Sequence, residues 1–225
     1  MAVTKDNVIV ISHDPILEPP VCSGPAKSAV IHTLTLAQVR EWDCGAVRNP
    51  RFPTQQTAPG TRMPTLDEVF RLATRGKFDF NIETKSFPDH PEYTPAPEEF
   101  ARLVLAKIRE YQLEKRIILQ SFDFRTLVAM RKLAPEIRLS ALVERDTRDF
   151  AAIAKEAAQA EIVSPEYHLV TPEKVAAAHA VGIQVVPWTA NTAADWDRLI
   201  AAKVDAIISD DPAELIRHLK RVEGR

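Results

Sequence analysis

Hydrophobic and polar positions repeat in a regular order from Phe78 to the end of the chain. A short apolar run is followed by a polar loop, then by a stretch in which apolar residues recur at helical spacing, then by the next apolar run. The runs are rich in β-branched residues and nearly continuous, which is typical of strands buried on both faces of a parallel sheet. We therefore predict six βα units within residues 78–223, with strands in the ranges 78–85, 116–122, 137–144, 160–167, 183–191 and 204–211.

Residues with known preferences for helix ends support these boundaries. Thr65 and Glu68 have the spacing of a capping box at the start of an earlier helix. Prolines stand at or near first helical positions, and N-cap residues precede two of them. Gly182 follows a helical stretch where a glycine is expected to end it. The prolines and N-caps are Pro97, Pro172, Pro212, Thr171 and Asp211.

Six consecutive βα units fit either a doubly wound open sheet or an eightfold barrel. Doubly wound nucleotide-binding proteins carry a glycine-rich first turn, whereas the six glycines of this chain form no GxG or GxxxxGK pattern. The predicted fold class is therefore α/β, of the (β/α)8 TIM-barrel type. Six units are two short of a closed barrel, so we expect the first one to two βα units to be missing from this chain.

The region before Phe78 follows a different pattern. Residues 7–14 form one strand-like run that ends in polar residues. Residues 14–64 contain prolines, turn-forming residues and one short helical pattern at 35–43. We interpret residues 14–64 as a small insertion within a single barrel domain that spans 1–225, and not as a separate domain.

Composition narrows the functional classes. The chain of 225 residues is 45% hydrophobic and 27% charged, as expected for an ordinary globular protein. A net charge of −2 without a basic stripe argues against nucleic acid as a partner, and no apolar run approaches the roughly 20 residues that span a bilayer. The N-terminal sequence lacks a signal-peptide pattern. Cys22 and Cys44 fit neither a CxxC pair nor a zinc site, so we expect two unpaired thiols, with a disulfide as the alternative in an exported protein.

The predicted strand ends are unusually polar, and in a (β/α) barrel the C-terminal ends of strands carry the chemistry. Glu83 and Lys85 are two residues apart on one strand, so their side chains are predicted to share a face. Together they could hold a cation and an anionic oxygen, or they could form an ordinary ion pair. The other polar residues at strand ends are His13, Asp14, Gln120, Ser121, Glu144, Ser164, Glu166, Trp188, Thr189, Asn191, Ser209 and Asp210.

Two aromatic side chains at strand ends have alternative roles. The imidazole of His13 could act as a general acid or base near neutral pH, although histidines at such positions are often structural. Trp188 could pack as barrel core or form an apolar wall beside a small organic group. His179 and His218 lie in helical stretches and are expected on the outer surface, whereas His90 lies in a proline-rich loop, 86–97, that could overhang the site.

Six ordered segments make the sequence recognisable: TKDNVIVISHD, MPTLDEVF, FNIETK, ILQSFDF, VVPWTAN and DAIISDDP. At these separations, over residues 4–212, they resemble the glycerophosphodiester phosphodiesterase family. The resemblance implies a (β/α) barrel enzyme that depends on a divalent cation, Ca²⁺ or Mg²⁺. Such an enzyme hydrolyses small-molecule glycerophosphodiesters to glycerol 3-phosphate and an alcohol, and residues 14–64 would match the family's inserted segment.

The same resemblance implies roles for individual residues. His13 matches one of two catalytic histidines, Glu83 a metal ligand and Lys85 the residue that binds the phosphate. Trp188 matches part of the wall around the glycerol moiety. The pocket-lining positions expected to contact the substrate are Gln120 and Ser121.

The chain also departs from the family pattern. The family's His-Arg-Gly and Glu-x-Asp segments, which supply the second histidine, an arginine and two metal-binding carboxylates, have no counterpart in residues 1–225. We expect Glu83 alone to bind the cation weakly, so that this polypeptide is inactive or nearly so. We also expect unpaired edges of an incomplete barrel to favour self-association.

Three interpretations remain open. The first is a phosphodiesterase whose N-terminal segment is missing from the sequence. The second is a catalytically inactive relative that binds phosphate or a partner. The third is another (β/α) barrel phosphodiesterase, such as a relative of phospholipase D-like toxins, which the PWTAN and SDDP segments fit less well. The compartment stays open too: cytoplasmic for the sequence as it stands, periplasmic or secreted with an upstream signal peptide.

Overall fold

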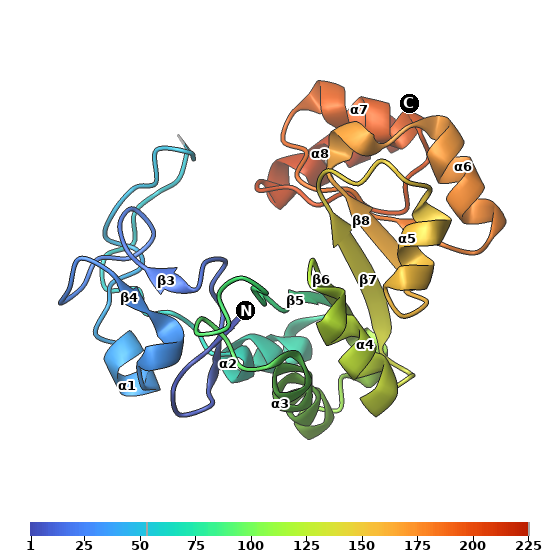
Figure 1. The fold of residues 1–225 in the computed structure, drawn as a ribbon. Helices are drawn as coiled ribbons and strands as arrows, with labels where there is room; N and C mark the ends of the chain where they lie inside the picture. Colours follow the sequence, from blue (N-terminus) through green and yellow to red (C-terminus); the bar gives the residue numbers. More distant parts are fainter. Residues whose placement is uncertain (53, 225) are drawn as a thin grey trace. The chain divides into compact units, whose positions relative to one another are not determined.

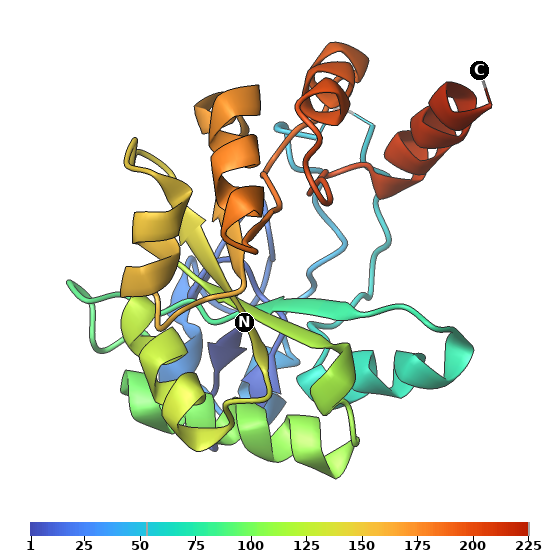
Figure 2. The same ribbon diagram turned by 90° about the vertical axis from the view of Figure 1, so that its right-hand side faces the viewer.

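The chain divides into two compact units, Met1–Ile137 and Arg138–Arg225. A computed structural model describes residues 1–52 and 54–224 (Figures 1 and 2). Both units contain parallel strands that are joined by helices. This arrangement confirms the predicted α/β class.

The first unit begins with two short antiparallel pairs. β1 (Ala2–Val3) pairs with β2 (Ile9–Val10), and β3 (Ile16–Leu17) pairs with β4 (Ala29–Val30). A 3-10 turn, η1 (Ile31–Thr33), and the short helix α1 (Leu36–Val39) follow. The N-cap of α1 is Thr35, whose side chain forms a capping box with Gln38.

The predicted insertion packs around a small core that it shares with Ala2 and Val10 of β1 and β2, and this core contains a disulfide. Cys22 is bonded to Cys44, and the described residues contain no free cysteine, so the expectation of two unpaired thiols is wrong. Trp42 is buried in this core and packs so closely on Gly24 that a Cβ at residue 24 would overlap its ring. The sequence did not predict the Cys22–Cys44 bond. The residues between the two cysteines show little of the hydrophobic periodicity from which their relative positions could be inferred.

The rest of the first unit is built on two parallel strands. The helix α2 (Leu66–Phe70) has the predicted capping box of Thr65 and Glu68 and continues into η2 (Arg71–Arg75). β5 (Phe80–Glu83) pairs in parallel with β6 (Ile117–Ser121), with Glu83 beside Gln120. The helix α3 (Pro97–Glu110) and the turn η3 (Glu114–Arg116) connect the two strands. The helix α4 (Phe124–Leu133) follows β6 and packs on α3.

The two faces of β5 have different surroundings. Phe80, Ile82 and Thr84 are buried, and the Thr84 hydroxyl lies 2.9 Å from that of Thr126 on α4. Because side chains alternate along a strand, Glu83 and Lys85 lie on the opposite face. The helices therefore cover one face of the strand, and the charged residues occupy the other.

The second unit repeats the strand–helix alternation. β7 (Arg138–Val143), β8 (Ile162–Pro165) and β9 (Gln184–Val185) are parallel and adjacent in this order. α5 (Phe150–Glu156) lies beside β7 and β8, as Figure 1 shows, and α6 (Pro172–Ala180) packs on α5 and β9. The turn η4 (Tyr167–Leu169) precedes α6, and the last two helices are α7 (Ala193–Ala201) and α8 (Pro212–Glu223).

The predicted helix ends of this unit are confirmed. Thr171 and Asp211 are N-caps whose side chains accept backbone hydrogen bonds, and Gly182 has a positive φ of 78°. The sixth predicted strand is different, because residues 204–211 form no regular strand among those described. Ile208 nevertheless donates to Pro187 O (2.9 Å) and accepts from Ala190 N (3.1 Å), so this run follows the end of β9.

One histidine is placed differently from the prediction. His218 on α8 is buried, and its Nε2 lies 2.7 Å from Asp197 Oδ1 on α7, so its expected place on the outer surface is wrong. The hydrophobic pattern of residues 212–223 correctly predicted that His218 lies in a helix, but it did not predict the contact with α7. Among the described residues, no helix combines the length and apolar character that a membrane crossing requires.

Candidate active site

The carboxyl end of β5 carries a nearly buried pair of opposite charges. Lys85 Nζ lies 3.0 Å from Glu83 Oε1, and the two side chains are 14% and 18% exposed. The contact is an ion pair without hydrogen-bond geometry, since Glu83 Oε1 is buried and accepts no hydrogen bond. A buried carboxylate oxygen without a hydrogen bond is rare in folded proteins and is a candidate ligand atom.

The main chain of β5 fixes this pair in place. Thr84 N donates to Gln120 O (3.1 Å), which extends the parallel ladder beyond Glu83. Ser121 Oγ donates to Thr84 O (2.9 Å) and accepts from Asp123 N (3.1 Å). The residue between Glu83 and Lys85 is therefore held on both sides, and the charged side chains project from a rigid segment.

The two candidate residues of β6 are engaged within the protein. Gln120 Oε1 accepts from Asn81 Nδ2 (3.0 Å), so Gln120 and Asn81 lie on the same face as Glu83. Ser121 is fully buried, and its hydroxyl makes the two main-chain contacts described above. Their expected contact with substrate stays a prediction.

The amino group of Met1 also reaches this strand. It donates to Glu83 O (2.7 Å). Burial lowers the pKa of this amine from 8.0 to about 5; the Glu83 carboxylate raises that pKa, and the Lys85 ammonium lowers it further. The amine is therefore largely uncharged at neutral pH, and Lys85 is the charged donor nearest to Glu83 among the contacts described.

His13 and Phe122 are the other notable side chains at strand ends in this unit. His13 follows β2 and is exposed, with Nδ1 2.9 Å from Asp14 Oδ1. Phe122 directly follows β6 and is 42% exposed, and its ring lies 5.2 Å from Lys85 Nζ. The sequence analysis did not single out Phe122, although an apolar residue directly after a polar strand end was a usable signal.

Trp188 belongs to the second unit, where its ring and main chain are both fixed. Its Nε1 donates to Ser164 O (2.8 Å), and its main chain bonds to Pro165 O (3.0 Å) and Tyr167 N (2.7 Å). Asn191 follows closely and holds the last loop, since it donates to Asp210 Oδ2 (2.8 Å) and accepts from Asp210 N (2.9 Å). The expected role of Trp188 at the glycerol moiety stays a prediction.

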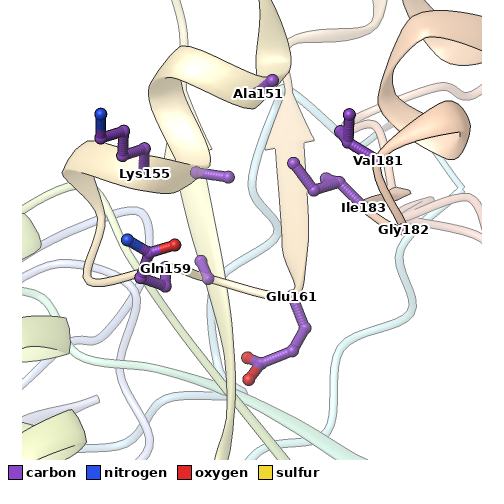
Figure 3. Close-up of a pocket in the computed structure, with 9 residues that line it drawn as sticks. Ala151, Lys155, Gln159, Glu161, Val181, Gly182 and Ile183 are labelled. Carbon is purple, nitrogen blue, oxygen red and sulfur yellow. The ribbon is translucent and has the colours of Figure 1, made fainter.

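The second unit also has a groove of about 430 Å³ between the loops that precede β8 and β9 (Figure 3). It lies at the amino-terminal ends of these strands, where barrels carry no chemistry. We therefore do not assign it to the active site. Its lining includes Ala151, Lys155, Gln159, Glu161, Val181 and Ile183.

The donor set for a metal ion is small. In residues 1–52 and 54–224, no group of three or more His, Cys, Asp or Glu side chains is placed to hold one. Glu83 Oε1 fits a ligand atom because it is buried and accepts no hydrogen bond. One carboxylate is fewer than a Ca²⁺ site commonly uses, whereas Mg²⁺ can be bound through one or two carboxylates with several waters. Because Lys85 Nζ already lies 3.0 Å from Glu83 Oε1, these residues fit at most a weakly held cation.

Comparison of the sequence with known proteins gives consistent matches. A profile of the Glycerophosphoryl diester phosphodiesterase family matches residues 1–214. A glycerophosphodiester phosphodiesterase of Caldanaerobacter subterraneus subsp. tengcongensis is 31% identical over 218 residues, which cover 97% of this chain and 83% of that protein. One from Bacillus subtilis is 27% identical over 233 residues, which cover 98% of this chain and 75% of that protein.

Solved structures agree with the sequence matches. A putative glycerophosphoryl diester phosphodiesterase from Silicibacter pomeroyi superposes with a TM-score of 0.89 at 29% identity, covering 98% of this chain and 82% of that one. A phosphodiesterase from Oleispira antarctica, solved in complex with the product sn-glycerol-3-phosphate, superposes with a TM-score of 0.80. At 20% identity, with 97% of this chain and 82% of that one covered, the second comparison supports the fold alone.

Proposed function

Because the chain belongs to the glycerophosphoryl diester phosphodiesterase family, we propose that it acts on glycerophosphodiesters and cleaves them to sn-glycerol 3-phosphate and an alcohol. The observation that carries the proposal is the Glu83–Lys85 pair at the carboxyl end of β5. The Oleispira antarctica phosphodiesterase holds sn-glycerol-3-phosphate, and we propose the same product for this chain.

Lys85 is proposed to bind the phosphate. Its ammonium has three donors, and its contact with Glu83 Oε1 lacks hydrogen-bond geometry. Its hydrogens therefore remain available to a non-bridging phosphate oxygen. Fixed positive charge in a nearly buried position stabilises the negative charge that gathers on these oxygens in the transition state.

Glu83 is proposed to be one ligand of a divalent cation. When bound, such a cation polarises the phosphate oxygens as a Lewis acid. Glu83 has a further effect on Lys85, because a carboxylate at 3.0 Å keeps the ammonium in place before the substrate arrives. Gln120 is proposed to line the pocket, and Ser121 is proposed to hold the main chain next to Lys85 through its contacts with Thr84 O and Asp123 N.

His13 is proposed to transfer a proton. A carboxylate accepts hydrogen bonds and does not donate them, so the contact with Asp14 Oδ1 places the hydrogen of the neutral ring on Nδ1. Nε2 is then free to take a proton from the attacking oxygen or, once protonated, to give one to the leaving alkoxide. When Nε2 takes up a proton, the Asp14 carboxylate stabilises the imidazolium that forms.

We further propose that the 225-residue polypeptide turns over slowly. A cation held by Glu83 with water ligands binds weakly, and His13 is the one histidine assigned to proton transfer. The predicted loss of the first one to two βα units would have this effect, and it stays a prediction, as does self-association through unpaired sheet edges. A polypeptide that binds glycerol 3-phosphate without cleaving any diester would match the inactive relative considered above.

The test couples release of glycerol 3-phosphate from glycerophosphocholine to a glycerol-3-phosphate dehydrogenase, at millimolar Ca²⁺ or Mg²⁺. We expect slow, cation-dependent turnover that Lys85→Met lowers at least 100-fold. Lys115→Met, an exposed lysine beside the start of β6, is the matched control and should leave the rate unchanged. Equal rates for both variants would refute the role of Lys85.

A second arm tests the proposed impairment. The same assay is run on a fusion that carries a family N-terminal segment with the His-Arg-Gly and Glu-x-Asp motifs. We expect the fusion to be faster and to reach its maximal rate at a lower cation concentration, because two more carboxylates join Glu83. A fusion no faster than the 225-residue polypeptide would contradict this.

A further inference from the structure

Phe122 is a large apolar side chain at the carboxyl end of β6, and the proposed function gives it no role. It directly follows Ser121, the last residue of the strand, and it is 42% exposed. Isolated exposed apolar side chains are common in folded proteins, so exposure alone assigns no role to this ring. Its neighbour does, because that neighbour is the ammonium group proposed to bind the phosphate.

The strand register brings Phe122 level with Lys85. Residues of β5 and β6 pair with a constant offset, which places Glu83 beside Gln120. Continued by two residues, the same offset places Lys85 beside Phe122. Side chains alternate along a strand, so both lie on the face that carries Glu83 and Gln120. The contact agrees with this, since Lys85 Nζ lies over the Phe122 ring, 5.2 Å from its centroid.

The backbone on both sides of Phe122 is fixed. Ser121 is fully buried, and its hydroxyl donates to Thr84 O (2.9 Å). Asp123 is the N-cap of α4; its main-chain N–H donates to Ser121 Oγ (3.1 Å), and its carboxylate accepts from Arg125 N (3.1 Å). The ring therefore projects from a rigid segment, which is the support that a side chain needs in order to orient another group.

The Phe122 ring and the Glu83 carboxylate hold the ammonium in different ways. The carboxylate lies 3.0 Å from Lys85 Nζ and opposes its charge. The face of an aromatic ring is the negative part of a quadrupole and attracts a cation within about 6 Å of its centroid. Because the ring has no net charge, it fixes the position of the ammonium without cancelling the charge that a phosphate oxygen would meet. A lysine side chain is long and flexible, and a second attraction restricts it further.

We propose that Phe122 is a positioning residue, whose ring face holds the Lys85 ammonium where the phosphate of the substrate binds. The inference rests on the proposed function, because that function assigns Lys85 to the phosphate. It deepens that function by naming a residue that acts through Lys85 and not by contact with the substrate. The simplest competing role is that of a cover, in which the ring only keeps water away from the ion pair.

Fluorinated phenylalanines separate these two roles, because fluorine weakens the negative ring face while the ring keeps nearly the same size. We expect the affinity for sn-glycerol 3-phosphate, measured by calorimetric titration, to fall stepwise as residue 122 carries one, two and three fluorine atoms, by about five-fold in all. The matched control is the same series at Phe78, which is 43% exposed, precedes β5 and has Arg116 Cζ 5.4 Å from its ring centroid. That series should leave the affinity unchanged. A flat series at residue 122, or an equal fall at residue 78, would overturn the proposal.

Inorganic phosphate shows whether the ring acts through Lys85 or touches the glycerol carbons. It has no carbon for the ring to contact, and we expect its affinity, followed by phosphorus NMR, to fall in the same ratio across the Phe122 series. Phe122→Leu should weaken the binding of both ligands, whereas Phe122→Tyr, which keeps a ring face, should bind them nearly as tightly as the parent chain. A loss confined to sn-glycerol 3-phosphate would overturn the proposal and make the ring part of a glycerol subsite.

Lys85→Met distinguishes failure of this inference from failure of the proposed function. We expect Lys85→Met to lower the affinity for both ligands, and fluorination of Phe122 to have no further effect in that variant, because the group through which the ring acts is gone. If fluorination lowers the affinity equally in the Lys85→Met variant, this inference fails and the proposed function stands. If Lys85→Met leaves the affinity unchanged, the proposed role of Lys85 fails, and this inference fails with it. The fluorinated series in the parent chain keeps the test decisive if Lys85→Met does not fold.

Discussion

Two parts of the first unit reach a defined structure by different means. In the β5–β6 part, parallel strands are paired in register and helices cover one face, so the charged pair on the other face sits on a regular backbone. In the insertion, strands are two residues long, and order comes from a disulfide and from a small core around Trp42. A segment with little repetitive structure thus depends on side-chain and covalent contacts.

This difference decides where chemistry can be placed. Glu83 and Lys85 are costly to bury, and their positions hold because the main chain between them is bonded on both sides. The insertion carries few buried charges, and its core is apolar apart from the disulfide. The regular part of the unit therefore holds a nearly buried pair of opposite charges, whereas the core around the insertion contains apolar residues and the disulfide.

The largest effect should come from breaking the charged pair. Lys85→Met keeps the apolar stem but leaves the nearly buried Glu83 carboxylate unpaired, which should cost about 3 kcal/mol of unfolding free energy. Adding Glu83→Gln removes the unpaired charge and should restore most of this loss. Urea unfolding of the single and double variants gives both values. If the double variant is as unstable as Lys85→Met, the electrostatic account is wrong.

The disulfide should give the next largest effect, confined to the insertion. Replacing Cys22 and Cys44 by serine opens a link between residues 22 apart in the sequence, which should lower stability by about 3 kcal/mol. Amide exchange should rise around Trp42 and Val39, while the amides of β5 and β6 keep their protection. Uniform loss of protection in both parts would show that the disulfide stabilises the whole unit and not the insertion alone.

The sequence predicted the regular part well because its signals are local. The Thr65–Glu68 capping box, the prolines that open α3, α6 and α8, and the shared face of Glu83 and Lys85 all follow from spacing along one element. The resemblance to known phosphodiesterases added what spacing could not give, namely the family, confirmed by the match over residues 1–214.

Contacts between distant segments were not predictable in this way. The Cys22–Cys44 bond, the buried place of His218 and the contact of Phe122 with Lys85 each depend on how separate elements pack. The run 204–211 was predicted to be a strand because it is apolar. Asp205 and Ile208 make main-chain hydrogen bonds to residues 185–190, but the run forms no regular strand among the described residues. Apolar composition predicted neither burial nor a regular ladder correctly here, since none of residues 204–211 is buried.

A pH titration tests the electrostatics of β5 without a mutation. The pKa of the Met1 amine is 8.0 as a free group and about 5 in the folded chain. Between these two pH values the unfolded chain carries a proton on this amine that the folded chain lacks. The free energy of unfolding is therefore highest above pH 8 and decreases as the pH falls toward 5. The loss between pH 8 and pH 6 should be about 2 kcal/mol. Acetylation of the amine should remove this dependence, and a slope that survives acetylation would assign it to another group.

The smallest effect expected is that of Ser121→Ala, which separates a structural from a binding role. The hydroxyl is fully buried between Thr84 O and Asp123 N, so its loss leaves a buried acceptor and a buried donor unpaired. That should cost about 1–2 kcal/mol of unfolding free energy. Affinity for glycerol 3-phosphate should change less than two-fold, because the ladder still fixes Lys85. Ser140→Ala, which removes a buried hydroxyl in the second unit, controls for the stability loss alone. A marked fall in affinity with unchanged stability would instead place the Ser121 hydroxyl in contact with the substrate.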